Sequence, residues 1–450
     1  MDRATLTALY LDEVRRRGLR AGDLLGDLPG LKPFYYRGRF LSRPVFIGYR
    51  ESRQLYADVE NMQDALLSLP DVLFGGDFAA FARAAGAYGA AAAVMASQTA
   101  RTRLARADLY ATGDGFRLLE LNHGSAIGGQ DNAFMGRALL RHPVLAEFAR
   151  THGLTCVDTL SHQIGTVFAE TGVDPRSGPV VAVTDWAVQS AATGDPHLDA
   201  IAADWRSLGV DAHPCYLGDL SCRGGRVWLG GCRIDVIYRL FTIAHLMQSP
   251  GGAAVLTPVL DAAARGEVAL CTSVDSEIFS SKAALAMISD DTNQHLFTAA
   301  QRESIARIVP WTRLVRPGPV TTPDGSRADL LDYAVAHQDE LILKPSTGTE
   351  GTGVIPGWKD LSPQQWRAHV TSASDPWYVL QERVRPESEL FPDESGALIP
   401  WNPVYGLFTG TPGYGGVYIR AAMAREADVI NRALGAFCGS CLSASPAGAA

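Results

Sequence analysis

No stretch of the 450-residue sequence has the roughly 18 consecutive apolar residues that a membrane-spanning helix needs. The first residues, MDRATLTALYLDEVRRRG, are charged and amphipathic, and they lack the apolar core of a secretory signal peptide. Basic residues are in short supply, because 40 Lys and Arg face 48 Asp and Glu, which gives a formal net charge of -8. Such a chain has little positive charge to neutralise phosphates or anionic lipids. The sequence therefore predicts a cytoplasmic protein that binds neither a membrane nor nucleic acid.

The seven cysteines are too few and too scattered to form a disulfide framework. Cys438 and Cys441 form a single C-x-x-C pair, but no second pair and no nearby histidine complete a zinc site. We therefore expect this pair to be structural or incidental.

Two common nucleotide-binding signatures are also missing. The glycine-rich run that begins at Lys344 does not end in Gly-Lys-Ser/Thr, which excludes a P-loop of the Walker type. No G-x-G-x-x-G follows the apolar run Pro179–Thr184, which argues against a Rossmann-type oxidoreductase.

The chain is longer than one ordinary hydrophobic core, so two or three packed subdomains are expected. Periodicity and turn signals predict a mixed α/β (α+β) chain of five segments. Residues 1–105 are expected to be mainly helical, 106–177 to open with a β-hairpin, 178–270 to form a small α/β unit with a parallel sheet, 271–440 to form a further α/β stretch, and 441–450 to be a frayed tail.

The predicted hairpin carries the first cluster of reactive side chains. Asp-Gly within the turn Thr112–Gly115 is a strong hairpin signal. Because side chains alternate along a strand, Arg106 and Asp108 share one face, as do Glu120 and Asn122. Carboxylate and amide oxygens suit Mg²⁺, and the arginine could hold a phosphate or an oxyanion. The alternative is a solvated hairpin of mixed charge.

A second cluster combines two lysines with a glycine-rich run, KPSTGTEGTGV, at Lys344–Val354. Glycines let backbone N–H groups approach phosphates, and Lys282 and Lys344 could supply positive charge. A flexible Gly/Thr hairpin is the alternative.

Two weaker signals lie elsewhere. The strand-like run Tyr378–Val384 ends in polar residues, where backbone groups could bind an adenine edge and Glu382 a ribose. Taken alone, an apolar strand with a charged end is the better explanation of this run. Arg239 and Arg420 each follow a strand-like run. Either arginine could bind an anionic substrate group or form a structural ion pair.

Taken together, these motifs resemble the circularly permuted branch of the ATP-grasp superfamily, which includes the synthetase domain of glutathionylspermidine synthetase. An R-x-D pair precedes E-x-N at residues 106–122, and N-x-x-S follows at 122–125. The later motifs run in the family's order over roughly residues 100 to 420: DVIYR, SSKAALAMISD, ILKPSTGTEGTGV, YVLQERV and GGVYIR. The metal motif lies before both lysines, which is the permuted order. The glycine-rich loop HGSAIGG departs from the family pattern.

The resemblance implies a circularly permuted ATP-grasp fold with a helical N-terminal part and a small Rossmann-like unit. Residues 106–177 would be the metal-binding part of the core, 178–270 the pre-ATP-grasp unit, and 271–440 the ATP-binding lid and remaining core. The implied ligands are ATP and Mg²⁺. Their binding residues would be Asp108, Glu120 and Asn122 for the metal, and Lys282, Lys344, Gln381, Glu382, Val384, Gly351 and Gly353 for the nucleotide under a mobile lid at 346–353. The arginines expected at the reacting centre are Arg106, Arg239 and Arg420.

The function that the resemblance implies is a ligase that activates a carboxylate as an acyl phosphate and transfers it to an amine. The expected substrates are an amino acid or small carboxylic acid and an amine or peptide acceptor, as in peptide ligases of natural-product and antibiotic biosynthesis. Two alternatives stay open: a kinase-like transfer of phosphate without ligation, and an inactive relative that only binds a nucleotide.

Overall fold

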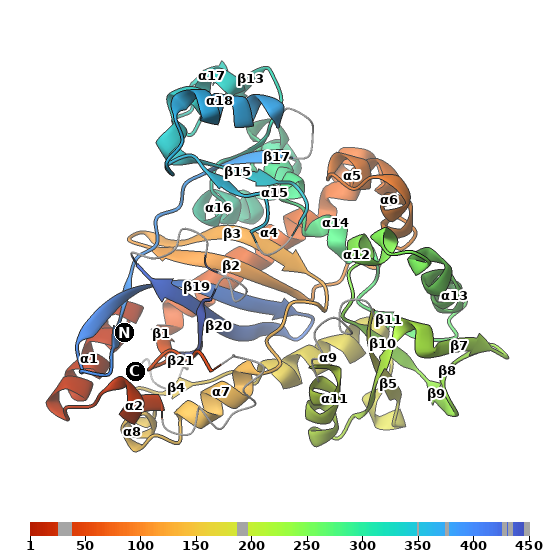
Figure 1. Cartoon of the computed structure of the whole chain (residues 1–450), viewed down its shortest axis with the longest axis horizontal. Helices are drawn as coiled ribbons and strands as arrows, with labels where there is room; N and C mark the ends of the chain where they lie inside the picture. The colour runs from red at the N-terminus through yellow and green to blue at the C-terminus, as the bar shows by residue number, and fades with distance from the viewer. Residues whose placement is uncertain are drawn as a thin grey trace.

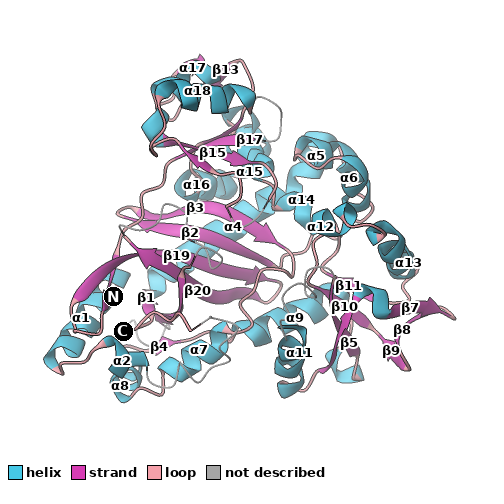
Figure 2. Cartoon of the chain, in the orientation of Figure 1, coloured by secondary structure: helices cyan, strands magenta, loops and turns pink. Residues whose placement is uncertain are grey.

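The fold was analysed in a computed structural model, in which the described residues are 1–25, 38–186, 197–348, 351–373, 378–424, 430 and 435–444. Figure 1 shows a central sheet with one small α/β unit above it and another beside it. Figure 2 shows helices around the sheet and between these units. Several sheets and many helices make this the mixed α/β chain that the sequence predicts.

The central sheet has eight strands and joins early and late parts of the chain. Its main path is β1 (Val45–Ile47), β21 (Phe437–Ala444), β20 (Gly413–Met423), β19 (Leu398–Gly410), β2 (Ala105–Thr112) and β3 (Gly115–His123), with β18 (Glu389–Pro392) on β19 and β4 (Leu154–Thr155) on β21. Only the β1–β21 pair is parallel. Strand β19 lies antiparallel to β2, with Gly406 opposite Asp108. The late strands therefore lie next to the early hairpin in the same sheet.

The prediction of a frayed tail at 441–450 is wrong for its first four residues. Cys441–Ala444 belongs to β21, which β20 and β1 flank on either side, and only 445–450 lies outside the described residues. Small residues in this strand allow close packing: a Cβ on Gly439 would lie 2.7 Å from the Leu41 side chain. Cys438 and Cys441 are three positions apart on a strand, so they point to opposite faces, and both are free thiols. This is consistent with the expected structural role of the pair.

The described part of residues 1–105 is mainly helical. Its helices are α1 (Arg3–Arg16), α2 (Ala21–Leu25), α4 (Tyr49–Phe74), α5 (Phe78–Ala84) and α6 (Gly89–Met95). Of these, α4 crosses behind the central sheet, while α5 and α6 lie beside α12 (Ile243–Gln248) and α14 (Ser276–Phe279) (Figure 1). In α4 the buried side chains recur at intervals of three and four, at Leu55, Val59, Met62, Leu66 and Leu69. This stripe shares one core with inward-facing residues of the sheet. The helix ends at Gly75, whose φ of 60° is in the left-handed region.

The α/β unit predicted at 178–270 contains the expected parallel sheet. Its strand order is β11 (Ala269–Cys271), β10 (Val236–Arg239), β5 (Val180–Asp185) and β6 (Asp211–Tyr216), and every pair is parallel. The helices around it are α9 (Thr159–Thr171), α11 (His197–Ser207), α12 (Ile243–Gln248) and α13 (Gly252–Ala264), and a small sheet of β7 (Leu220–Arg223), β8 (Arg226–Leu229) and β9 (Cys232–Ile234) lies beside them.

The unit above the central sheet contains most of residues 276–382. Its antiparallel sheet has the order β12 (Thr312–Leu314), β17 (Tyr378–Glu382), β15 (Leu341–Pro345) and β16 (Ile355–Pro356). The flanking elements are α14 (Ser276–Phe279), α15 (Lys282–Ser289), α16 (Ala299–Ile308), the hairpin β13 (Pro319–Thr321)–β14 (Arg327–Asp329), α17 (Leu330–Ala336) and α18 (Pro363–Ser372). It has its own small core around Trp366 and Leu380. Two more helices, α7 (Asn132–Leu139) and α8 (Pro143–Thr151), follow the hairpin β2–β3.

Among the described residues, no single helix has the length and apolar character needed to cross a bilayer; only the sharply bent pair α4 and α5 meets the requirement, by length and composition.

Trp205 of α11 is expected to contribute strongly to the stability of the parallel unit. Its side chain is fully buried, and its ring packs on that of Tyr238 with centroids 4.8 Å apart. Replacing it with alanine leaves a large cavity, so Trp205→Ala should lower the free energy of unfolding by about 3–5 kcal/mol. Urea denaturation measures this. The control is Leu208→Ala, at a 43% exposed position nearby, with an expected change within about 0.5 kcal/mol. Equal effects of the two changes would contradict the packing described.

Candidate functional site

The hairpin β2–β3 brings the predicted polar residues together. Arg106 lies directly opposite Asn122, and Asp108 opposite Glu120. The register shifts between Asp108 and Leu109, a local irregularity that lies next to the polar pairs. The amide nitrogen of Asn122 donates to Asp108 Oδ2 at 3.2 Å and lies 3.5 Å from Glu120 Oε1. Two carboxylates and one amide therefore form a single contiguous group.

Asp108 is a buried carboxylate held by two arginines. Its side chain is 3% exposed. Arg106 donates to it in bidentate fashion, from Nε at 2.8 Å and Nη2 at 3.0 Å, and Arg420 Nη2 of β20 lies 2.7 Å from Oδ1. Burial would raise the pKa of Asp108, but the charges of Arg106 and Arg420 outweigh it and lower this pKa to about 2. Asp108 is therefore ionised at neutral pH.

Both predicted lysines approach the same hairpin from the unit above it. Lys282 is the first residue of α15, and its Nζ lies 3.2 Å from Glu120 Oε2. Lys344 of β15 donates to the carbonyl of Leu119 at 3.2 Å and to Gln381 Oε1 at 2.6 Å. Residues separated by more than 150 positions thus meet in one place.

The charges at this meeting point shift one another's pKa. Burial and the nearby Lys282 lower the pKa of Lys344 to about 8, against the opposing attraction of Glu120. Burial would raise the pKa of Glu120, but Lys282 and Lys344 bring it below its ordinary value. An additional anion in the site would relieve the repulsion between the two lysines.

The other residues expected to bind nucleotide lie around β17. Gln381 is buried and bridges Lys344 to Thr312 Oγ1, to which its Nε2 donates at 3.1 Å. Glu382 is exposed at the end of the strand, with its backbone N–H bonded to Trp311 O. Val384 packs against the small apolar cluster that contains Tyr110 and Val404. Gln381 is the one of the three shown in contact with a predicted lysine. The role of all three in binding adenine or ribose stays a prediction.

The predicted lid at 346–353 is described only in part, because residues 349–350 lie outside the described residues. Gly351 and Gly353 have φ of 76° and 74°, the left-handed region that favours glycine. A Cβ on Gly353 would also lie 2.9 Å from Pro345 Cγ. On the lid's other side, Lys282 Nζ lies 3.5 Å from the carbonyl oxygen of Gly348. Movement of the lid stays a prediction.

The two strand-borne arginines differ in what they contact. Arg239 directs all five guanidinium N–H groups to protein acceptors: the carbonyls of Thr272, Phe241 and Ser273, Ser276 Oγ and Glu277 Oε1. Arg420 lies beside Asp108, but its buried Nε has no hydrogen-bond partner within the described part of the chain. The structural alternative therefore accounts for Arg239, while Arg420 retains a donor for an anionic ligand.

The loop that links β3 to α7, at 124–131, closes the site from the side. Its carbonyls are tied to surrounding side chains: Tyr238 OH donates to Ser125 O at 3.3 Å, Gln163 Nε2 donates to Gly128 O at 2.7 Å, and Arg106 donates to Ile127 O. Gly129 has φ of 95°, and a Cβ there would run into the ring of Phe408. The glycines of this loop are visible in the sequence. Gln163 and Tyr238 were missed, because nothing in the sequence connects them to it.

The donor set fits a hard divalent cation through Glu120 and Asn122 better than through Asp108. Both oxygens of Asp108 already accept from Arg106, and the amide of Asn122 also donates to it. The described residues contain no cluster of three or more His, Cys, Asp and Glu side chains that could hold a metal ion. Asp108 is thus better placed to position the arginines, and its expected role as a metal ligand stays a prediction.

Comparison with known proteins identifies the fold. No protein-family model matches the sequence, and no curated protein sequence matches it. Among solved structures, a glutathione synthetase-like effector from Globodera pallida matches with a TM-score of 0.54 and 11% identity over 89% of both chains. A candidate gamma-glutamylcysteine synthetase from Methylobacillus flagellatus KT matches with a TM-score of 0.42 and 12% identity, over 86% of this chain and 88% of that one. The second likeness is too loose to carry an argument.

The first likeness shows a shared fold and nothing beyond the fold. The ATP-grasp assignment itself stays a prediction from the sequence motifs. The circularly permuted order of the motifs stays a prediction.

Asp108→Asn should destabilise the protein, because it leaves Arg106 and Arg420 buried without their counter-ion. Removing one partner of a buried ion pair costs about 3–5 kcal/mol, and we expect a loss of that size in the free energy of unfolding. The matched control is Asp114→Asn in the turn of the same hairpin, where the side chain is 69% exposed and pairs with Arg117. That change should cost less than about 1 kcal/mol. An unchanged free energy of unfolding in Asp108→Asn would show that the two arginines do not depend on the carboxylate.

Proposed function

We propose that this protein is an ATP-dependent carboxylate–amine ligase that works through an acyl phosphate. One observation carries the proposal: Lys282 Nζ lies 3.2 Å from Glu120 Oε2, and Lys344 Nζ lies 3.2 Å from the carbonyl of the adjacent Leu119. Two cations that share one acidic hairpin form a charged site suited to a polyphosphate and its cation. The fold shared with a glutathione synthetase-like protein supports the same conclusion.

The proposed role of each residue follows from its charge: cations bind the phosphates, and oxygen ligands bind the metal ion. Lys282 and Lys344 would bind the phosphates of ATP, and Gln381 would keep Lys344 in place through its 2.6 Å hydrogen bond. Glu120 and Asn122 would hold Mg²⁺, which when bound neutralises phosphate charge and orients the terminal phosphoryl group. Gln381, Glu382 and Val384 are the proposed lining of the adenine and ribose pocket, and the residues around Gly351 and Gly353 the cover over the phosphates.

The arginines would serve the reacting centre. A carboxylate oxygen of the acid attacks the terminal phosphorus of ATP, the bond to the bridging oxygen breaks, and ADP leaves. The amine nitrogen then attacks the carbonyl carbon of the acyl phosphate, inorganic phosphate leaves, and the amine loses a proton. Arg106 and Arg420, held together by Asp108, would stabilise the negative charge on the phosphoryl and carbonyl oxygens. Arg239 would act by supporting the adjoining loop, because its own donors are satisfied.

At a finer level, the proposed acid is an amino acid or other small carboxylic acid, and the acceptor an amine or peptide. The proposed setting is natural-product biosynthesis, by analogy with the peptide ligase of pheganomycin biosynthesis, and the proposed compartment is the cytoplasm.

An assay of ADP release tests the proposal. Purified protein with ATP and Mg²⁺ is screened against amino acids in pairs with peptides, and products are identified by mass. A product equal to acid plus amine minus water, formed together with ADP, is the expected outcome. ADP release with a phosphorylated acid and no amide would instead indicate a kinase. Nucleotide binding without turnover for any pair would favour the inactive alternative.

Lys344 gives the site a dependence on pH. With a pKa of about 8 it is mainly protonated at pH 7 and mainly neutral at pH 9. The affinity for ATP should therefore fall as pH rises, by up to about tenfold between pH 7 and pH 9. Titration calorimetry at the two pH values measures this.

The variant Lys344→Met should bind ATP weakly at both pH values, and its ATP affinity should no longer depend on pH. The exposed Lys359→Met is the matched control and should behave like the unchanged protein. Unaltered ATP affinity in Lys344→Met would remove this lysine from the phosphate site.

A further inference from the structure

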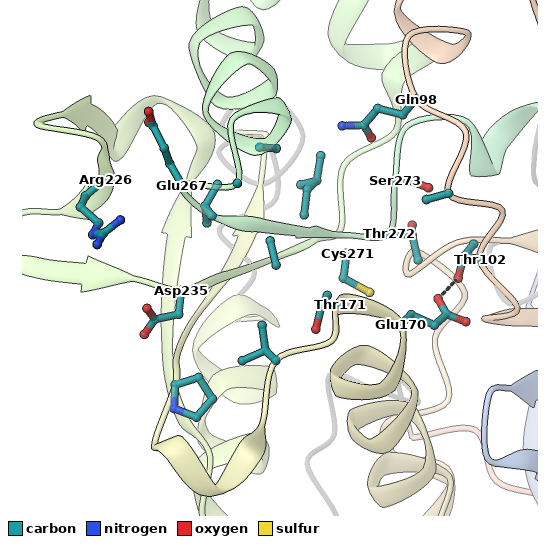
Figure 3. A pocket seen from close by; sticks show the side chains of 18 of the residues that line it. Gln98, Thr102, Glu170, Thr171, Arg226, Asp235, Glu267, Cys271, Thr272 and Ser273 are labelled. Carbon is teal, nitrogen blue, oxygen red and sulfur yellow. Dashed lines mark hydrogen bonds between the residues drawn. The ribbon is translucent and has the colours of Figure 1, made fainter.

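A cavity of about 950 Å³ opens along the free edge of the parallel sheet, away from the site described above. Strand β11 is the edge strand, and one of its sides pairs with β10. The other side lines the cavity from Val268 to Ser273. Figure 3 shows this segment crossing the cavity, with Arg226, Asp235 and Glu267 at one end and Thr102, Glu170 and Ser273 at the other. The volume is in the range of sites that take a small ligand or a short peptide.

The backbone of β11 offers an unused hydrogen-bonding edge. Ala269 N–H donates to Asp235 O at 2.9 Å, on the β10 side. In a parallel ladder the residues alternate between the two neighbours, so the N–H and C=O of Leu270 turn toward the cavity. Leu270 is half-buried, and no backbone partner contacts it among the residues that the structure describes. Such an edge is a template for an added strand.

One end of the cavity carries a carboxylate without a counter-ion. Glu170, near the end of α9, accepts from Arg103 N at 2.7 Å, from Thr411 Oγ1 at 3.1 Å and from Thr102 Oγ1. These donors fix its position, but no cation pairs with it among the described residues. Burial raises the pKa of Glu170 above its ordinary value, against the effect of these hydrogen bonds. A positively charged group placed there would gain an ion pair.

The opposite end carries an arginine with donors to spare. Arg226 Nη1 donates to Gly225 O at 3.2 Å. Of the two carboxylates at this end, Glu267 is bound in bidentate fashion by Arg265 at 2.6 and 3.1 Å, and Asp235 is paired with Arg233 at 2.8 Å. Arg226 is therefore the group at this end best placed to receive a carboxylate.

We infer that this cavity binds a short peptide in an extended conformation, antiparallel to β11, with its terminal ammonium at Glu170 and its terminal carboxylate near Arg226. Strand β11 runs from the Arg226 end toward the Glu170 end, so only the antiparallel direction matches both charges. The segment Val268–Ser273 spans roughly 15–20 Å, which accommodates an extended peptide of about four or five residues. Val268 and Leu270 supply the backbone hydrogen bonds, because the N–H and C=O of Thr272 are already bonded to Ser125 and Arg239. The two ends set the direction and the requirement for free termini.

The inference does not depend on the proposed ligase activity, and binding is tested without nucleotide. Titration calorimetry with tetra-alanine that has free termini should show saturable binding. Blocking the amino end by acetylation or the carboxyl end by amidation should each weaken binding by about tenfold, the effect of losing one charge-assisted hydrogen bond. Two N-methylated peptides are then compared. Methylation of the N–H groups that face β11 should weaken binding strongly, and methylation of the alternate N–H groups, which face away, should weaken it little.

Variants of the protein locate the two ends. Arg226→Ala should weaken binding of tetra-alanine by about tenfold and leave binding of its amidated form unchanged, since the interaction is already lost there. Arg223→Ala, on the neighbouring β7 and outside the cavity, is the matched control and should have no effect. Glu170→Gln should likewise affect only peptides with a free amino end, and the acetylated peptide reports on whether that variant still folds.

Three results would overturn the inference: absence of saturable binding by tetra-alanine, equal weakening of the free and amidated peptides by Arg226→Ala, or binding of single alanine as tight as that of the peptide.

Discussion

The site depends on one buried carboxylate between two arginines. Asp108 lies on β2, Arg420 on β20, and β19 separates their strands. Two guanidinium groups could not share this buried position without a counter-charge, because mutual repulsion and lost hydration would oppose folding. With Asp108 present, the same arginines become fixed cations at the sheet surface. Arg106 also reaches the loop at Ile127, so a single charge cluster connects the central sheet to the wall of the site.

A second electrostatic constraint links the upper unit to the sheet. Lys282 and Lys344 belong to different elements, yet both contact residues 119 and 120 of β3. Burial and the charge of Lys282 lower the pKa of Lys344, and Glu120 offsets only part of that effect. The arrangement is therefore incomplete on its own and suited to an anion. A site in which bound charge completes the balance can couple ligand binding to closure of the unit above it.

Much of the local structure follows from the sequence because its causes are local. The three- and four-residue spacing from Leu55 to Leu69 has one low-energy solution, a helix with one buried face. The Asp-Gly turn fixes the hairpin, and the hairpin alone places Asp108 opposite Glu120. Convergence of the two lysines on that hairpin was expected from resemblance, since their separation in sequence carries no geometric information.

What the sequence could not reveal depends on long-range packing. The segment Cys441–Ala444 has the composition of a tail, and only its neighbours in the sheet make it a strand. The full engagement of Arg239 depends on acceptors near residues 272–277, which no spacing rule connects to it. The same holds for Gln163 and Tyr238, which support a loop dozens of positions away.

The parallel pairing of β1 with β21 has a consequence for biosynthesis. Val45–Ile47 is synthesised almost 400 residues before Phe437–Ala444, and β2 almost 300 residues before β19. Until then the early hairpin presents an unpaired edge and an uncovered apolar face, the kind of surface that chaperones shield in nascent chains. The central sheet can therefore be completed only after β21 has been synthesised, and the acidic cluster acquires its second arginine only at that late stage.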